Sequence, residues 1–63
     1  MLSPREREIL WMLAEGLNGQ AIARRLFLSP ETVRTHVRNA TTKLGAKTRV
    51  QAVALVVAGT SGR

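Results

Sequence analysis

The side chains best suited to binding chemistry gather in one stretch, SPETVRTHVRNATTKLG, which spans residues 29–45. Its apolar residues recur at i, i+4, i+7 and i+11, the spacing of one stripe along an amphipathic helix: Val33, Val37, Ala40 and Leu44. The opposite face carries two arginines and three short hydrogen-bonding side chains: Arg34, Thr35, Arg38, Asn39 and Thr42. We expect no carboxylate on this face, because the only acid of the segment, Glu31, begins the helix, where the helix dipole stabilises it. An ordinary solvated helix mixes both charge signs, so this face is suited to an anionic partner.

The positive charge of the chain is concentrated in the same half. The chain has 63 residues and a formal net charge of +6, and its length predicts one domain, residues 1–63, with a small core. Residues 1–28 carry four arginines against three glutamates, whereas residues 29–63 carry six basic residues against one glutamate. A basic half on a small domain favours a polyanionic partner, with nucleic acid ahead of a membrane surface.

Several classes of chemistry lack the residues they need. The chain has no cysteine, one histidine and no aspartate, and its glutamates fall at predicted helix starts or on charged helix faces. That leaves no catalytic triad, metal site or phosphate-binding glycine loop, so we expect neither enzymatic activity nor a cofactor. The first residues lack the apolar run of a secretory signal, and the longest apolar run, residues 52–58, is too short to span a bilayer. We therefore expect a soluble, cytoplasmic protein without a membrane partner.

Start and stop signals divide the chain into four predicted helices, over about residues 4–15, 19–26, 30–44 and 49–58. Each start follows a side chain that can cap a helix: Ser3, Asn18, Ser29 and Thr48. Ser3 with Glu6, and Thr48 with Gln51, have the spacing of a capping box. Three of the helices are expected to end at glycines, namely Gly16, Gly45 and Gly59. No segment alternates with period two, so the predicted fold class is all-α.

The second and third predicted helices, joined by the short segment FLS, have the lengths and spacing of a helix-turn-helix. Ala23 supports this prediction because its small side chain lets two helices cross closely, while Phe27 occupies the turn where glycine is usual. In this geometry residues 30–38 can enter the major groove of DNA. Arginine can bind O6 and N7 of guanine, and hydroxyl and amide groups can reach base edges or phosphate oxygens. The pattern therefore predicts a partner of double-stranded DNA.

The chain resembles the helix-turn-helix domain of the LuxR, FixJ, NarL and GerE regulators of bacterial transcription, through LSPREREIL, LAEGLNGQAIARRLFLSPETVRTHVRNATTKLGAKTR and QAVAL. The resemblance covers residues 2–58 and implies a four-helix domain whose third helix reads DNA and whose fourth helix makes a homodimer contact. Positions that match the base-reading residues of the family are Arg34, Thr35 and Arg38. Positions that match its phosphate contacts are Gln20, Thr32, Asn39, Thr42 and Lys47. In this family the domain usually follows a regulatory domain, so the chain is expected to be either an excised fragment or a free-standing regulator.

Ala21 stands where the family often has a glutamate that completes a capping box, and the chain departs from the family pattern in two further places. Ala40 and Thr41 stand where the family usually has larger apolar residues, which predicts thinner packing at the end of the third helix. Gly19 and Gln20 replace the more usual asparagine and basic residue, which predicts a weaker phosphate contact. None of these departures changes the base-reading positions.

The fourth predicted helix is apolar on all sides, because only Gln51 is polar between residues 50 and 58. In so small a domain one side of this helix would be left in water, which predicts a symmetric dimer seam rather than a tightly wrapped terminal helix. Two stripes could face outward, Val50 with Ala54 and Val57, or Ala52 with Leu55 and Val56. We assign the dimer interface to the first, and the resemblance favours an inward position for Ala52, Val53 and Val56.

Trp11 is expected to project from the first helix among Arg7 and Glu15, where it could dock a regulatory domain or RNA polymerase. An alternative function is therefore a protein-interaction module that uses Trp11 and the fourth helix, with the basic face incidental. Binding of RNA or of DNA without sequence preference is a further hypothesis, although the chain lacks the aromatic residues that stack on single strands. His36 is expected to pack at the border of the apolar stripe, and Lys43 is expected to be solvated.

Overall fold

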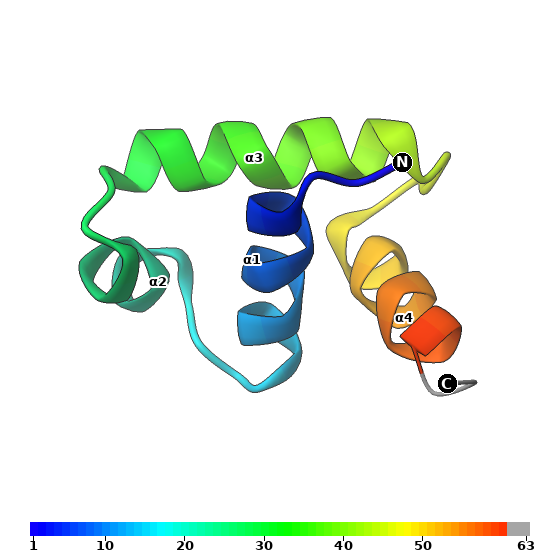
Figure 1. Cartoon of the computed structure of the whole chain (residues 1–63), viewed down its shortest axis with the longest axis horizontal. Helices are drawn as coiled ribbons and strands as arrows, with labels where there is room; N and C mark the ends of the chain where they lie inside the picture. Colours follow the sequence, from blue (N-terminus) through cyan, green and yellow to red (C-terminus); the bar gives the residue numbers. More distant parts are fainter. Residues whose placement is uncertain (61–63) are drawn as a thin grey trace.

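The computed structural model describes residues 1–60, which form four helices and, within that range, no strand. The helices are α1 (Pro4–Ala14), α2 (Gly19–Leu26), α3 (Pro30–Lys43) and α4 (Arg49–Thr60) (Figure 1). The all-α, four-helix prediction is confirmed. The bounds differ from the expected ones by at most two residues, and the prediction that Gly59 ends the last helix is wrong, since α4 continues through it. A glycine inside a helix costs only about 1 kcal/mol relative to alanine, so it need not end the helix.

The helix starts are fixed by the capping side chains that the sequence predicts. The Ser3 hydroxyl accepts a hydrogen bond from the Glu6 N–H at 3.1 Å, and the Glu6 carboxylate accepts one from the Ser3 N–H at 2.9 Å, a complete capping box. The side chains of Asn18 and Ser29 cap α2 and α3 by accepting a hydrogen bond from the N–H of Ala21 and of Thr32 respectively. At the start of α4 the Thr48 hydroxyl accepts from the Gln51 N–H, as expected. The reciprocal bond differs, because the Gln51 side chain accepts from the N–H of Lys47.

Three helices end in a left-handed residue followed by a backbone hydrogen bond that returns to the last turn. Glycine supplies this residue after α1 and α3, at Gly16 (φ 98°) and Gly45 (φ 67°). After α2 the same place is taken by Phe27 (φ 58°), and the Leu28 N–H donates to the carbonyl of Ala23 at 2.8 Å. The turn between α2 and α3 therefore has ordinary closing geometry, but it is formed by a residue for which that geometry is strained.

Two apolar clusters form the core, and α1 contributes to both. The first joins α1, α2 and the first half of α3, through Ile9, Met12, Ile22, Ala23, Val33 and Val37. The second joins α1, the second half of α3 and α4, through Leu10, Ala40, Ala52 and Val56. Because Ala40 is fully buried and small, α1 and α4 contact α3 closely there. Among the described residues, no helix is both long and apolar enough to cross a membrane.

The second cluster corrects the prediction for Trp11. This side chain is half-buried and packs against the second cluster instead of projecting freely. The physical reason is that α4 runs back beside α1, which gives α1 a second covered side that its own periodicity does not reveal.

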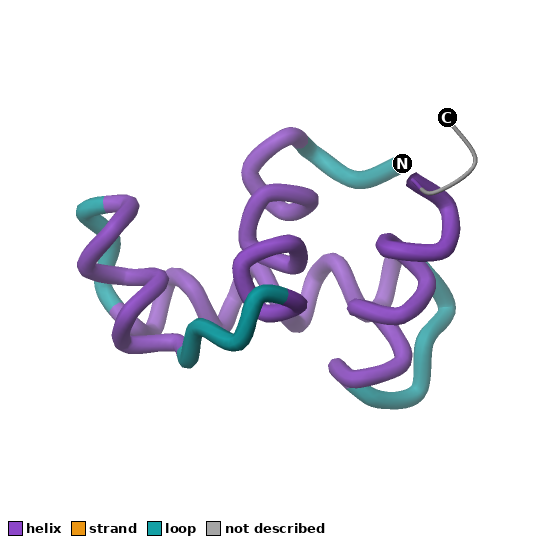
Figure 2. The backbone as a smooth tube through the Cα atoms, turned by 90° about the horizontal axis from the view of Figure 1, so that it is seen from below, coloured by secondary structure: helices purple, strands orange, loops and turns teal. Residues whose placement is uncertain are grey.

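The arrangement of the helices leaves one side of α3 uncovered. In Figure 1, α3 runs across the top and α1, α2 and α4 all lie beneath it. Figure 2, seen from below, shows α3 behind the other three helices, so the two views agree. Three helices pack against one side of α3, and none covers its opposite side.

Candidate nucleic-acid interface

The uncovered side of α3 carries the residues that the sequence predicts for base reading. Val33, Val37 and Ala40 are buried, and these residues recur at i, i+4 and i+7. Shifting that spacing by two residues, slightly more than half a helical turn, reaches the opposite side of the helix: Glu31, Thr35 and Arg38 in one direction, and Thr35, Asn39 and Thr42 in the other. We define the outer face of α3 as the exposed residues on or next to this opposite side: Glu31, Arg34, Thr35, Arg38, Asn39 and Thr42.

The two arginines of the outer face are free to bind a partner. Within residues 1–60, neither Arg34 nor Arg38 forms an ion pair or a side-chain hydrogen bond. The Thr35 hydroxyl donates to the Glu31 carbonyl at 3.1 Å, which holds that side chain against its own helix and leaves the oxygen lone pairs outward. A guanidinium offers five N–H donors in a planar fork, which suits the paired acceptors of guanine or the oxygens of a phosphate.

The residues predicted for phosphate contacts are all exposed, and they come from three parts of the chain. Thr32, Asn39 and Thr42 lie on α3, Gln20 lies in the first turn of α2, and Lys47 precedes α4. Exposure makes each of these side chains accessible to a partner but does not test a contact with phosphate, so the assignment stays a prediction. The Thr32 hydroxyl lies 2.9 Å from that of Ser29, so the cap of α3 and this position share one small polar network.

A hollow of about 360 Å³ lies between the starts of α2, α3 and α4. Its lining includes Gln20, Arg34 and Arg49, of which the first and the last are 29 positions apart in the sequence. Sequence reasoning did not assign Arg49 to the site. The sequence shows only that Arg49 directly follows the Thr48 cap. The packing of α4 beside α1 is what brings Arg49 near Arg34.

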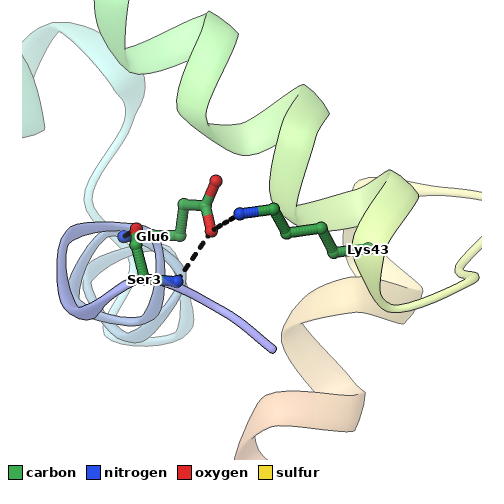
Figure 3. A network of polar contacts seen from close by, with 3 residues as sticks. All are labelled: Ser3, Glu6 and Lys43. Carbon is green, nitrogen blue, oxygen red and sulfur yellow. Dashed lines mark hydrogen bonds and ion pairs between the residues drawn. The ribbon is translucent and has the colours of Figure 1, made fainter.

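The position of α3 is fixed at its far end by an ion pair that sequence reasoning missed. The Lys43 ammonium lies 3.0 Å from Oε1 of Glu6, the same oxygen that accepts from the Ser3 N–H (Figure 3). Glu6 lies at the start of α1, as expected, but it is only 4% exposed, and the sequence pattern did not predict this burial. Lys43 is exposed, as expected, with 44% of its side chain accessible, but its ammonium also neutralises this buried carboxylate. The Ser3 N–H first, and then Lys43, lower the pKa of Glu6 below its ordinary value of 4.5, against the opposing effect of desolvation.

Glu31 corrects the expectation that the outer face carries no carboxylate. It lies at i relative to Thr35, Arg38 and Thr42 at i+4, i+7 and i+11, the same spacing as the buried stripe. It is exposed and lines a shallow depression of about 340 Å³ along α3, together with Thr32, Thr35 and Asn39. The error arose from placing Glu31 only by its distance from the helix start, although its spacing assigns it to the outer face. His36, half-buried at the edge of the same depression, lies at the border where the sequence places it.

No group of three or more histidine, cysteine, aspartate or glutamate side chains within residues 1–60 is arranged to hold a metal ion.

A short helix, a tight turn and a longer helix with an uncovered polar side together define a helix-turn-helix protein. Residues 1–56 match the family described as bacterial regulatory proteins, luxR family, and the chain belongs to that family.

Proteins from three different bacteria are similar to this chain in sequence. Over 55 residues it is 46% identical to the nitrate/nitrite response regulator protein NarL of Escherichia coli, covering 87% of this chain and 26% of NarL. Over 53 residues it is 47% identical to the spore germination protein GerE of Bacillus subtilis, covering 84% of this chain and 72% of GerE. A Mycobacterium tuberculosis protein named as an HTH-type transcriptional regulator, Rv0890c, is 48% identical over 52 residues, which are 82% of this chain and 6% of that protein. The chain thus spans a small part of NarL and Rv0890c and most of GerE.

A solved structure has the same fold. The crystal structure of the response regulator ChrA, from a heme-sensing two component system, superimposes with a TM-score of 0.79 at 42% identity. The match covers 86% of this chain and 27% of that one.

Proposed function

We propose that this chain binds double-stranded DNA at a preferred sequence and serves as the output domain of a regulator of bacterial transcription. The observation that carries the proposal is the outer face of α3, which is uncovered and holds two arginines without an ion-pair partner in residues 1–60. Membership of the luxR family supports the regulatory role. A regulator of this kind acts in the cytoplasm, where bacterial DNA lies.

In the proposed complex α3 lies in the major groove. Arg34, Thr35 and Arg38 face base edges, where a guanidinium can form two hydrogen bonds with guanine. Phosphate contacts come from the exposed polar residues around this helix: Gln20, Thr32, Asn39, Thr42 and Lys47. Arg49 joins them, because it lines the hollow between the helix starts beside Arg34. Phosphate contacts fix the register of the protein on DNA, and base contacts supply the sequence preference.

We further propose that two copies pair through α4. Ala52 and Val56 are buried in the second cluster and Val53 packs against it, so the opposite side of α4 faces outward. That side is apolar, with Val50 77% exposed, Ala54 exposed and Val57 half-buried. Leu55, at 42% exposed, extends the apolar surface at one edge. A symmetric pair would place two α3 helices at half-sites about one helical turn of DNA apart.

Partners beyond DNA remain those expected from the family resemblance, a regulatory domain and RNA polymerase. The half-buried Trp11 supports neither in particular, since its packing within the domain accounts for its presence. The alternative function as a protein-interaction module therefore depends on the outward side of α4 alone.

The test is a comparison of two duplexes. One is selected by the protein from a random pool, and the other is a scrambled duplex of equal length and composition. We expect Arg38→Ala to weaken binding to the selected duplex by about 1–3 kcal/mol and to weaken the scrambled duplex much less, as measured by fluorescence anisotropy at stated salt. Arg5→Ala is the control, because it removes the same charge from α1, on the covered side of α3. Equal losses on both duplexes would make Arg38 a phosphate contact, and failure to select any duplex would overturn the proposal.

A further inference from the structure

The outer face of α3 contains a feature that charge attraction to DNA does not explain. Glu31 lies in the same stripe as Thr35 and Arg38, near the end of α3 that enters the groove in the proposed complex. A carboxylate there opposes the negative potential of the groove and lowers affinity for DNA in general. Its presence on the outer face calls for a compensating interaction.

Inside the protein the helix dipole at the start of α3 stabilises the Glu31 carboxylate, but no cationic side chain of residues 1–60 pairs with it, even though Arg34 is one turn away. The hydrogen bond from the Thr35 hydroxyl, at 3.1 Å, goes to the Glu31 backbone carbonyl and not to the carboxylate. The side chain is exposed and lines the shallow depression on α3, where Asn39 and Thr32 also lie.

A carboxylate offers hydrogen-bond acceptors only, so it discriminates sharply between base edges. Guanine presents O6 and N7 acceptors and thymine presents the O4 acceptor, and each of these repels a carboxylate. Adenine offers the N6 amino group beside the N7 acceptor, whereas cytosine offers its N4 amino group with no acceptor next to it. Cytosine is therefore the base edge that suits Glu31 best.

We propose that Glu31 is a specificity-determining residue that accepts a hydrogen bond from the N4 amino group of one cytosine in each half-site. This inference rests on the proposed function, since it requires α3 to lie in the major groove. Glu31 acts in two ways: it favours a cytosine at one position, and it weakens binding to every sequence that lacks that cytosine. The arginines supply attraction that is partly indifferent to sequence, and the carboxylate restricts where that attraction is effective.

The test replaces each base pair of the selected duplex in turn and measures affinities of the parent, Glu31→Gln and Glu31→Ala by fluorescence anisotropy. For the parent we expect one position per half-site at which replacing cytosine weakens binding about tenfold, as for a good base contact. Glu31→Gln should lose this preference and favour adenine there, because an amide can donate to N7 while it accepts from N6. Glu31→Ala should lose the preference without gaining another, and both variants should bind the scrambled duplex more tightly than the parent does.

Glu15→Gln is the matched control. Glu15 is exposed at the end of α1, so this variant removes the same charge away from the outer face. It should leave the preference at every base pair unchanged. A role of Glu31 only in stabilising the first turn of α3 would change thermal unfolding but would leave the base preferences of Glu31→Gln the same as those of the parent.

The two failures can be told apart. A parent that selects a duplex, with unchanged preferences in Glu31→Gln, would overturn the inference and leave the proposed function standing. A parent that selects no duplex would overturn both.

Discussion

The ammonium of Lys43 and the carboxylate of Glu6 lie 3.0 Å apart and join the last turn of α3 to the first turn of α1. The residues are 37 positions apart in the sequence. The same Glu6 oxygen caps α1 through the Ser3 N–H, so one carboxylate both starts α1 and holds the far end of α3. Because α3 carries the candidate interface, this contact helps to set the angle at which its outer face is presented.

The first prediction concerns the pH dependence of folding. The pKa of Glu6 is lower in the folded chain than its ordinary value of 4.5, which applies when the chain is unfolded. The ionised carboxylate therefore stabilises the fold at pH values above about 4.5, and this stabilisation is lost as the pH falls through the lower, folded value. Denaturant unfolding between pH 7 and pH 3 should show the parent losing stability in acid, and Glu6→Gln should lose less over the same range.

Variants of the partner lysine sharpen this test. Lys43→Met removes the ammonium beside Glu6, whereas Lys47→Met removes an exposed lysine whose side chain forms no ion pair or hydrogen bond within residues 1–60. We expect Lys43→Met to lower the melting temperature at pH 7 and Lys47→Met to leave it nearly unchanged. Equal effects of the two substitutions would show that the ion pair does not contribute to the stability of the fold.

The second prediction concerns Phe27, which is 95% exposed and left-handed in the turn between α2 and α3. Glycine adopts this backbone conformation without the steric cost that a side chain brings, and almost no packing is lost when an exposed ring is removed. Phe27→Gly should therefore stabilise the domain by about 0.5–1 kcal/mol in denaturant unfolding.

Phe27→Ala is the control for this effect. It removes the ring but keeps the strained backbone, so its stability should stay close to that of the parent. If both variants were destabilised to the same extent, the ring rather than the backbone would be what matters at this position.

The third prediction separates phosphate contacts from base contacts through salt. Lys47 is exposed before α4 and is assigned to a phosphate. Lys47→Ala should weaken binding to the selected and the scrambled duplex alike, and it should reduce the slope of log K against log salt by about one. Anisotropy titrations at four or more salt concentrations measure both quantities. An unchanged slope would remove Lys47 from the interface.

The fourth prediction concerns the dimer. Val50 lies on the outward side of α4 and is 77% exposed, so Val50→Glu costs little in the isolated domain. If α4 is the seam, each pair would bring two new carboxylates together across it, and sedimentation velocity should show a shift from dimer to monomer. Affinity for a duplex with two half-sites should fall with it.

A carboxylate at the other end of the molecule provides the control. Phe27→Glu places the same group on an exposed apolar position in the turn between α2 and α3, at the end opposite α4 (Figure 1). It should leave the oligomeric state unchanged. Dissociation by Phe27→Glu but not by Val50→Glu would place the seam at that turn.

Most features of α3 could be predicted from the sequence. Its start at Ser29, its end near Gly45 and its buried stripe follow from capping, left-handed closure and periodicity, which involve residues within about one or two turns of each other. The same periodicity also assigns Glu31 to the outer face, so that error was one of interpretation and not of missing information. The base-reading and phosphate assignments come from the family resemblance, and they remain predictions.

The helices, their capping side chains and the apolar stripe of α3 could be predicted from the sequence, because those features depend on neighbours in the chain. Three other relationships follow from the packing of the helices: Lys43 neutralises Glu6, Trp11 is half-buried, and Arg49 lies near Arg34. The packing also shows which side of α4 faces outward, since that helix is apolar all round and no periodic signal distinguishes its sides. Each of these relationships joins residues from different helices, and the packing of whole helices against one another brings such residues together.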